Sequence, residues 1–362
     1  MRIGIPRETK VGEYRVALTP AGVAALVSAG HEVFVESLAG QGSRLDDDRY
    51  KAAGAGIASA SEVWANSDLV LKVGEPIERE YRFFRDGLVL FAFLHLATNV
   101  ALTRALVESR VTAVAYETVE QCDGTLPLLV PMSEIAGRIA VQTGAALLEK
   151  AQGGRGMLLG GVPGVAPSKV VILGGGVVGY NAARVARRLG ASVTILERSD
   201  SRLRHLSSVI GGNLTILQSS QLEVDEAIVS ADLVVGAVLV PGARTATIVQ
   251  RGTVGEIKPR SVIVDVAIDQ GGCVETSIAT THAVPTYIAE GVVHYCVTNM
   301  PSAVPITSTV ALSNVSLPYF MKVAQYGIEG AISRDPALAR GVNVSRGRLL
   351  HEAVAAAHRL QS

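Results

Sequence analysis

Short runs of apolar residues alternate with helical patterns along the first part of the chain. The first run is Ile3 to Ile5. A helix is predicted from Thr19 to Gly30, since Thr suits an N-cap, Pro the first turn and Gly the position past the end. The same pattern predicts strands at 31–35, 69–73, 88–93 and 111–116 and helices at 61–66 and 99–109. This alternation is typical of an α/β layer structure.

A second α/β pattern begins after a long predicted helix at 132–151 and a stretch rich in Gly and Pro at 152–167. Strand, turn, helix and strand then follow within about 30 residues, from Val170 to Leu196. Further strands are predicted at 233–238, 262–266 and 295–297, and helices at 310–326 and 349–360. The chain is therefore expected to hold two α/β domains, and its last helices can pack back on the first.

Composition removes several classes of protein. Lys and Arg total 33, as do Asp and Glu, so no basic excess points to a nucleic acid partner. No clean apolar segment reaches the ~20 residues of a membrane span, and no signal peptide precedes the first charges, so we expect a cytoplasmic protein without a membrane partner. The three cysteines lack the spacing of a zinc site or disulfide framework, and no metal is expected.

The strongest local signal is the turn Gly174-Gly-Gly176-Val177-Val178-Gly179, between a predicted strand and a predicted helix. Glycines there allow a tight turn and close approach of the backbone to a pyrophosphate, whose charge the helix N-terminus meets. A packing turn in a Gly-rich protein is the alternative. Glu197 ends the next strand, where a carboxylate binds ribose hydroxyls and repels a 2′-phosphate, although Arg198 could accommodate one. The sequence therefore predicts NAD rather than NADP.

Other candidate residues lie next to predicted strands. Asp265 and Asp269 surround the end of the strand at 262–266, where a catalytic role and a turn-forming role are equally open. His95 follows the strand at 88–93, and a structural histidine is the alternative there. Arg15 lies in a polar loop after the first strand, where it could also be a solvated surface charge.

Together these segments resemble bacterial L-alanine dehydrogenases, whose sister group is the NAD-binding subunit of proton-translocating transhydrogenase. The segments that carry the resemblance are 1–10, 14–23, 93–97, 128–134, 152–156, 160–164, 236–242, 265–272 and 297–301. The resemblance implies a homohexamer that reversibly deaminates L-alanine to pyruvate and ammonia with NAD. It also implies a Rossmann dinucleotide-binding domain at 131–301, inserted in a discontinuous α/β substrate domain formed by 1–130 and 302–362.

The resemblance also implies roles for single residues. Arg15 would clamp the substrate carboxylate, while His95 and Asp269 would act as acid and base groups. Met132 and Asn299 would lie near the substrate. The positions that match NAD-contacting segments are Ser133, Gly174, Gly176, Val177, Val178, Gly179, Glu197, Arg202, Ser219, Val238, Leu239, Val266, Ala267, Ile268, Asp269, Val297, Thr298, Asn299 and Met300.

One position departs from the family pattern. Members carry Lys-Val-Lys-Glu-Pro before the His95 strand, and the second lysine contacts the substrate, whereas this sequence reads Lys72-Val73-Gly74-Glu75-Pro76. Lys72 is two residues, or about 6.6 Å, away along a strand and is a poor substitute. A related NAD-dependent oxidoreductase or lyase for a different amino or 2-oxo acid therefore stays open, as does a non-catalytic NAD-binding subunit.

Overall fold

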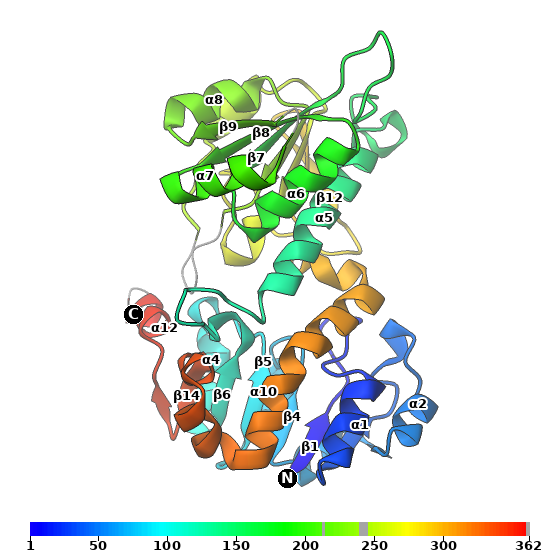
Figure 1. Cartoon of the computed structure of the whole chain (residues 1–362), viewed down its shortest axis with the longest axis vertical. Helices are drawn as coiled ribbons and strands as arrows, with labels where there is room; N and C mark the ends of the chain where they lie inside the picture. The colour runs from blue at the N-terminus through cyan, green and yellow to red at the C-terminus, as the bar shows by residue number, and fades with distance from the viewer. Residues whose placement is uncertain (212–213, 239–244, 360–362) are drawn as a thin grey trace. The chain divides into compact units, whose positions relative to one another are not determined.

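The computed structural model describes residues 1–211, 214–238 and 245–359 (Figure 1). Within these residues the chain forms two compact units: 1–132 with 302–359, and 133–211, 214–238 and 245–301. Each unit carries a mainly parallel sheet with helices packed on it, so the predicted α/β class is confirmed. No helix in the described part is long and apolar enough to cross a membrane.

The first unit has a sheet with the order β15-β14-β6-β5-β4-β1-β2-β3. Its strands are β1 (Arg2–Ile5), β2 (Glu32–Glu36), β3 (Gly56–Ala58), β4 (Leu69–Leu71), β5 (Val89–Ala92), β6 (Thr112–Ala115), β14 (Val342–Ser345) and β15 (Arg348–Leu349). Its helices are α1 (Pro20–Ser28), α2 (Asp47–Ala52), α3 (Ala60–Asn66), α4 (Val100–Glu108), α10 (Pro305–Arg334), α11 (Pro336–Gly341) and α12 (Glu352–Arg359). The strands from β3 to β6 are parallel, and β14 and β15 extend the sheet in antiparallel fashion.

Strand β5 shows why the strands of this sheet are apolar at nearly every position. Leu90 packs in a buried cluster with Leu102 of α4, whereas the next residue, Phe91, points to the other face. There its ring lies 5.2 Å from that of Phe320 on α10, which crosses in front of the sheet in Figure 1. Because both faces are covered, strand positions on either side must be apolar.

The second unit has a sheet with the order β12-β13-β11-β10-β7-β8-β9, in which only β12 is antiparallel to its neighbour among the described strands. Its strands are β7 (Lys169–Leu173), β8 (Ser192–Glu197), β9 (Leu214–Gln218), β10 (Leu233–Gly236), β11 (Val262–Asp265), β12 (Thr286–Ala289) and β13 (Val292–Tyr295). Its helices are α5 (Val130–Leu147, which begins at the boundary of the units), α6 (Val177–Arg188), α7 (Asp200–Val209), α8 (Gln221–Val229) and α9 (Arg251–Glu256).

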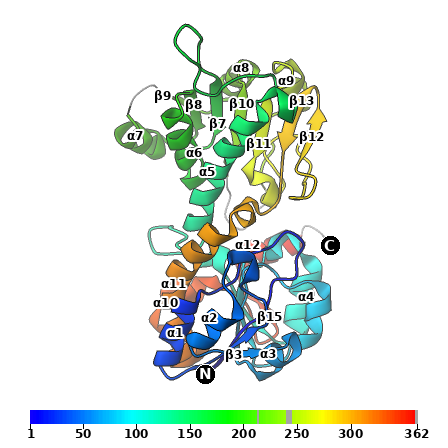
Figure 2. The same cartoon turned by 90° about the vertical axis from the view of Figure 1, so that its right-hand side faces the viewer.

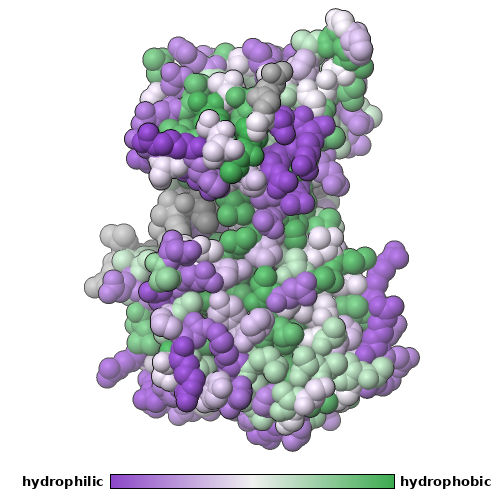
Figure 3. Space-filling model, viewed as in Figure 1, coloured by the Kyte–Doolittle hydropathy of each residue, from purple (hydrophilic) through white to green (hydrophobic). Residues whose placement is uncertain are grey.

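The order of this second sheet reverses at β7. After β7 the chain adds β8 on one side and later β10 on the other, with α6 packed on all three strands (Figure 2). The turn between β7 and α6 therefore lies at a topological switch point, where open α/β sheets bind ligands beyond the carboxyl ends of their strands. On the face seen in Figure 3, hydrophilic and hydrophobic residues are interspersed on both units.

Several predicted boundaries were wrong. The strand predicted at 295–297 lies at Val292–Tyr295, because Gly291, with φ +76°, forms the turn that pairs it with β12. The helix predicted at 310–326 begins at Pro305 and ends at Arg334. The last helix begins only at Glu352, since β15 occupies the residues where it was expected to start.

Candidate active site

The glycine turn after β7 has two kinds of glycine. Gly174 has φ +95°, and a Cβ there would lie 2.8 Å from the carbonyl oxygen of Ala237. A Cβ on Gly179 would lie 1.9 Å from the Gly174 carbonyl oxygen, so both residues are required for packing. Gly176 differs, because it caps α6 without a side-chain hydrogen bond and a Cβ there would meet nothing within 4 Å. Open space therefore lies before the N-terminus of α6, as binding of an anion requires.

Glu197 lies beside this turn at the end of β8. Its Oε2 accepts a hydrogen bond of 2.7 Å from the Gly175 amide, and its Oε1 accepts from the amides of Arg198 and Ser199. Arg202 donates from Nε to the Gly175 carbonyl oxygen at 2.6 Å. The carboxylate is thus held against the turn, and its remaining lone pairs can accept hydroxyl groups.

The two aspartates near β11 have different environments. Asp265 is fully buried and accepts hydrogen bonds from the amides of Ala267, Cys273 and Val274 and from Ser277 Oγ. Burial raises the pKa of Asp265, and these hydrogen bonds oppose the increase. Asp265 therefore shapes the loop, as the turn-forming interpretation expects.

Asp269 is exposed, and its Oδ1 accepts a 2.9 Å hydrogen bond from the Asn299 amide. The structure thus brings together two of the predicted substrate-side residues of the second unit. Asn299 has φ +58°, a left-handed conformation that is uncommon for residues other than glycine and is often found at functional sites.

The other positions predicted to contact NAD lie mostly beyond the carboxyl ends of parallel strands, at one edge of the second sheet. They are Val177 and Val178 in the first turn of α6, Ser219 after β9, Val238 after β10, Val266, Ala267 and Ile268 after β11, and Val297, Thr298 and Met300 after β13. Ser133 lies on α5, and Leu239 lies outside the described residues.

In the first unit, Arg15 is not a solvated surface charge, since its side chain is only 3% exposed. Its Nε and Nη2 form a two-pronged ion pair with Glu13 at 2.7 and 2.6 Å. Its Nη1 lies 3.1 Å from Met132 Sδ, so two predicted substrate-side residues are in contact. A thioether is a weak acceptor, and a carboxylate would be a stronger partner for this nitrogen.

His95 follows β5 and lies directly before the short 3-10 helix Leu96–Thr98. It has φ +48°, and Glu117 accepts hydrogen bonds from its amide at 2.7 Å and from that of Leu94. Its half-buried imidazole stacks on Phe93, and neither ring nitrogen has a hydrogen-bond partner among the described residues. The position of the ring is thus set by its backbone and by Phe93.

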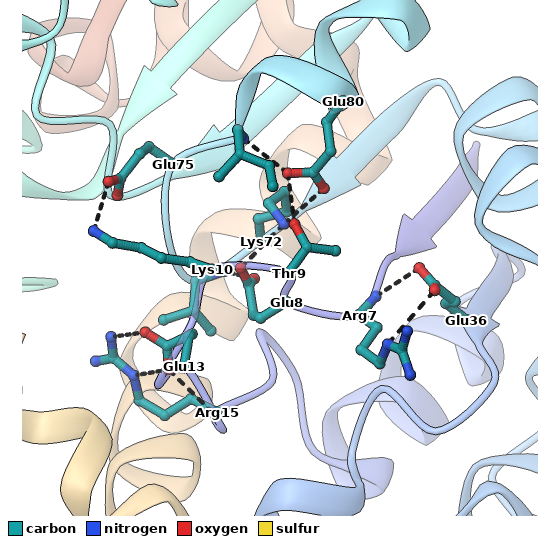
Figure 4. A network of polar contacts seen from close by, with 12 residues as sticks. Arg7, Glu8, Thr9, Lys10, Glu13, Arg15, Glu36, Lys72, Glu75 and Glu80 are labelled. Atoms are coloured by element: carbon teal, nitrogen blue, oxygen red, sulfur yellow. Dashed lines mark hydrogen bonds and ion pairs between the residues drawn. The ribbon is translucent and has the colours of Figure 1, made fainter. Parts of the chain in front are cut away.

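Lys72, the residue that the sequence offered as a substitute for the family lysine, is fully buried. Its Nζ lies 3.0 Å from Glu8 Oε2 and 3.2 Å from Glu80 Oε1 (Figure 4). Burial alone would lower the pKa of Lys72, but the two carboxylates raise it. The lysine is therefore engaged as a buried cation between two acids.

Sequence reasoning missed the four acids around these groups. Glu8 and Glu13 lie in the loop after β1, Glu80 follows β4, and Glu117 follows β6. Their only common signal is that each comes soon after a parallel strand, at the edge where ligands bind. Burial raises the pKa of Glu8 to about 7, Lys72 opposes the increase and Glu13 adds to it.

Known proteins resemble this chain in sequence. Models of the alanine dehydrogenase/PNT N-terminal and C-terminal domains match residues 4–136 and 140–352. The chain is 52% identical to the alanine dehydrogenase of Mycolicibacterium smegmatis over 356 residues, 98% of this chain and 96% of that protein. It is also 52% identical to that of Geobacillus stearothermophilus over 364 residues, 99% of this chain and 97% of that one.

Solved structures show the same relationship. An L-alanine dehydrogenase structure covers all of this chain and is itself fully covered, with a TM-score of 0.94 and 50% identity. A transhydrogenase from Sinorhizobium meliloti shares the fold, with a TM-score of 0.82 and 24% identity over 97% of this chain and 100% of that one. By sequence over nearly its whole length, and by fold, this chain belongs to the alanine dehydrogenase family and is an amino-acid dehydrogenase.

Proposed function

We propose that the protein catalyses the reversible, NAD-dependent oxidative deamination of L-alanine to pyruvate and ammonia. The observation that carries this proposal is the 52% identity to alanine dehydrogenases over nearly the full chain. Residues 131–301 would form the NAD-binding domain, and residues 1–130 with 302–362 the substrate domain. The same relationship leads us to propose a cytoplasmic homohexamer, which light scattering on the purified protein would test.

The described residues fit NAD. The open space before α6 at Gly176 would take the pyrophosphate, and Glu197 beside the turn would accept the ribose hydroxyls. The chemistry supplied by the cofactor, when bound, is acceptance of a hydride from the substrate Cα. A carboxylate at Glu197 would repel a 2′-phosphate, so we expect tighter binding of NADH than of NADPH in fluorescence titrations. Equal affinities would contradict this role of Glu197.

Three residues of the chain would act on the substrate. Arg15 would hold the carboxylate through its guanidinium, which already contacts Met132. His95 would take a proton from the water that adds to the imine carbon and release it to solvent, and the neutral imidazole would then take the proton of the carbinolamine hydroxyl as the ketone forms. Asp269, next to Asn299, would hold the amino nitrogen and, carrying a proton taken up from solvent, would deliver it as the C–N bond breaks, so that ammonia leaves.

A second candidate is the same chemistry on a different amino or 2-oxo acid, and Gly74 favours it. A Cβ at this buried position would meet only Glu8 Oε2, at 3.8 Å, so there is room for a group from the substrate. A non-catalytic NAD-binding subunit is a weaker candidate, since it has no need of Arg15, His95 and Asp269 together.

One assay separates these candidates. NADH absorbance is followed with ammonia and a panel of 2-oxo acids, and in reverse with the corresponding amino acids. Activity confined to pyruvate and alanine supports the first candidate, and a preference for another acid supports the second. If no acid is turned over, the protein is not the dehydrogenase that we propose.

A further inference from the structure

We propose that the space over Gly74, beside the carboxylate of Glu8, is a binding site for an ammonium group that does not come from this chain. The group would be the terminal ammonium of a substrate side chain, or a free ammonium or primary alkylammonium ion. The substrate side of this inference rests on the function proposed above, whereas the binding site itself can be tested without turnover.

The backbone at position 74 does not require glycine, and glycine there leaves space unfilled. Gly74 is buried, yet Glu8 Oε2, at 3.8 Å, is the only atom outside its chain neighbours that a Cβ would meet within 4 Å. Unlike Gly174, it does not have a positive φ that would favour glycine. A larger residue would therefore be tolerated, and the free space borders directly on a carboxylate oxygen.

That oxygen lacks part of its hydrogen bonding. The Glu8 side chain is 2% exposed, and its Oε1 accepts a 2.6 Å hydrogen bond from the Val73 amide. Its Oε2 forms an ion pair with Lys72 Nζ at 3.0 Å, and no further hydrogen-bond partner of this oxygen is found among the described residues. A carboxylate oxygen can accept a second hydrogen bond, so a hydrogen-bond donor over Gly74 would be stabilised there.

The surrounding charges favour a donor that is also a cation. The buried ionic groups are the acids Glu8, Glu13 and Glu80 and the bases Lys72 and Arg15, which leaves one negative charge in excess when all are ionised (Figure 4). The half-exposed pair Lys10–Glu75 is balanced within itself. Burial is the main cause of the raised pKa of Glu8, and of the neighbouring charges Glu13 adds to the increase while Lys72 opposes it.

An ammonium group suits the site better than a metal ion. Among the described residues no group of three or more His, Cys, Asp or Glu side chains could hold a metal. An ammonium needs no such cage, since it carries up to three or four N–H donors and a single positive charge. One donor would meet Glu8 Oε2, and the charge would balance the excess acid.

Thermal unfolding tests binding without activity. At a pH about one unit above the Glu8 pKa, ethylammonium chloride should raise the Tm of the wild type by about 3 °C at a tenfold excess over its Kd. Sodium chloride of equal ionic strength and tetramethylammonium chloride, which has no N–H donor, should not. Gly74→Lys fills the space with its own ammonium and Gly74→Met with an uncharged chain of similar length, and each should abolish the shift.

Glu8→Gln removes the charge but leaves a carbonyl oxygen for the Val73 amide, and it should also abolish the shift. If that variant does not fold, the two Gly74 variants still decide the matter, because they leave Glu8 in place. An equal rise in Tm in wild type and both Gly74 variants, or no rise in wild type, overturns the site.

Substrate assays identify the source of the ammonium. If a substrate side chain brings it, 2,3-diaminopropionate should exceed its apolar isostere 2-aminobutyrate by about tenfold in kcat/KM, and Gly74→Met should remove the preference. If the ion is free, the diamino acid has no advantage, and ethylammonium instead raises alanine turnover in wild type but not in Gly74→Met. A Tm shift without turnover of any amino acid supports the site and contradicts the proposed function, so the two failures are distinct.

Discussion

At the scale of single residues, the site of the first unit depends on buried ion pairs. Arg15 is nearly enclosed and shares its fork with Glu13, so the substrate binding proposed for it would depend on geometry as much as on charge. Glu8 and Lys72 are likewise buried, and the pKa of each depends on the charges beside it. Substitutions that preserve charge while changing shape are therefore the most informative.

Arg15→Lys should raise the KM for alanine by about tenfold or more, because the lysine keeps the charge but loses the planar fork that binds a carboxylate. It also avoids leaving Glu13 unpaired, as alanine would. NADH affinity, measured by fluorescence, should not change. Arg7→Lys is the matched control, since Arg7 is half exposed and pairs with Glu36. An unchanged KM in Arg15→Lys would contradict the clamp.

Glu8 should make the wild type lose stability as pH rises. Its folded pKa of about 7 lies above the unfolded value of 4.5, so the folded state binds the proton more tightly. The contribution is therefore present below about pH 4.5 and is lost as pH rises through 7, on the order of 3 kcal/mol. Lys72, Glu13 and the buried Tyr116 are the ionisable groups that act on this carboxyl or are influenced by it.

The measurement is the free energy of unfolding of wild type minus that of Glu8→Gln, from urea denaturation across this pH range. The difference should decrease with rising pH. Glu62→Gln should show the opposite sign and only below about pH 4.5, because hydrogen bonds from Ser59 lower the pKa of Glu62 beneath its unfolded value. A difference between wild type and Glu8→Gln that stays constant with pH would show that Glu8 does not titrate in this range.

At the scale of elements, the ends of a helix could be predicted from local residues, whereas several strands could not be predicted from their own sequence. Thr19 caps α1 and accepts a hydrogen bond from the Gly22 amide, and Gly30 follows with φ +85°, so both predicted ends of this helix are confirmed. Strands β3, β9, β12, β14 and β15 were missed, because short strands at or next to the edge of a sheet are defined by their partners more than by their own pattern.

The glycine turn of α6 permits a prediction with an internal control. Gly176→Ala should fold normally but weaken NADH binding by about tenfold, since its methyl group would enter the space before the helix N-terminus. Gly179→Ala should lower the free energy of unfolding by about 1–3 kcal/mol or more, because its methyl group would collide with the Gly174 carbonyl oxygen. Urea denaturation and NADH titration measure the two effects. Unchanged NADH affinity in Gly176→Ala would contradict the proposed pyrophosphate position.

At the scale of the whole molecule, the proposed work is divided between the two units. Arg15 and His95 belong to the first unit, while Asp269, Glu197 and the glycine turn belong to the second. Family membership, established by identity over the whole chain, includes both units. Changes in one unit should thus affect chemistry and cofactor binding separately.

His95→Asn tests this division. Asn tolerates the left-handed backbone of position 95 but cannot replace an imidazole as acid and base, so kcat should decrease by about 100-fold to 10,000-fold. The Kd for NADH without substrate should stay within about twofold of wild type, because the glycine turn lies in the other unit. His31→Asn serves as control. A large loss of NADH affinity in His95→Asn would show that the two functions are not separable.

The sequence alone determined the α/β class, the glycine turn and the acidic residue that ends β8. These depend on residues near one another in the chain: helix caps, the period of apolar positions, and a strand that leads into a glycine-rich turn. The resemblance then supplied Arg15, His95 and Asp269 as candidates. Local spacing carries this information because each feature forms within one βαβ unit or one turn.

Only the tertiary structure decided what surrounds those candidates. Asp265 and Asp269 look alike in sequence, yet one is enclosed by the amides of its loop and the other is exposed. The ion pairs of Lys72 with Glu8 and Glu80, and the space between Gly74 and Glu8, depend on loops that follow different strands. Burial and the charge balance of such a cluster are properties of side chains brought together by sheet pairing, and spacing along the chain does not specify them.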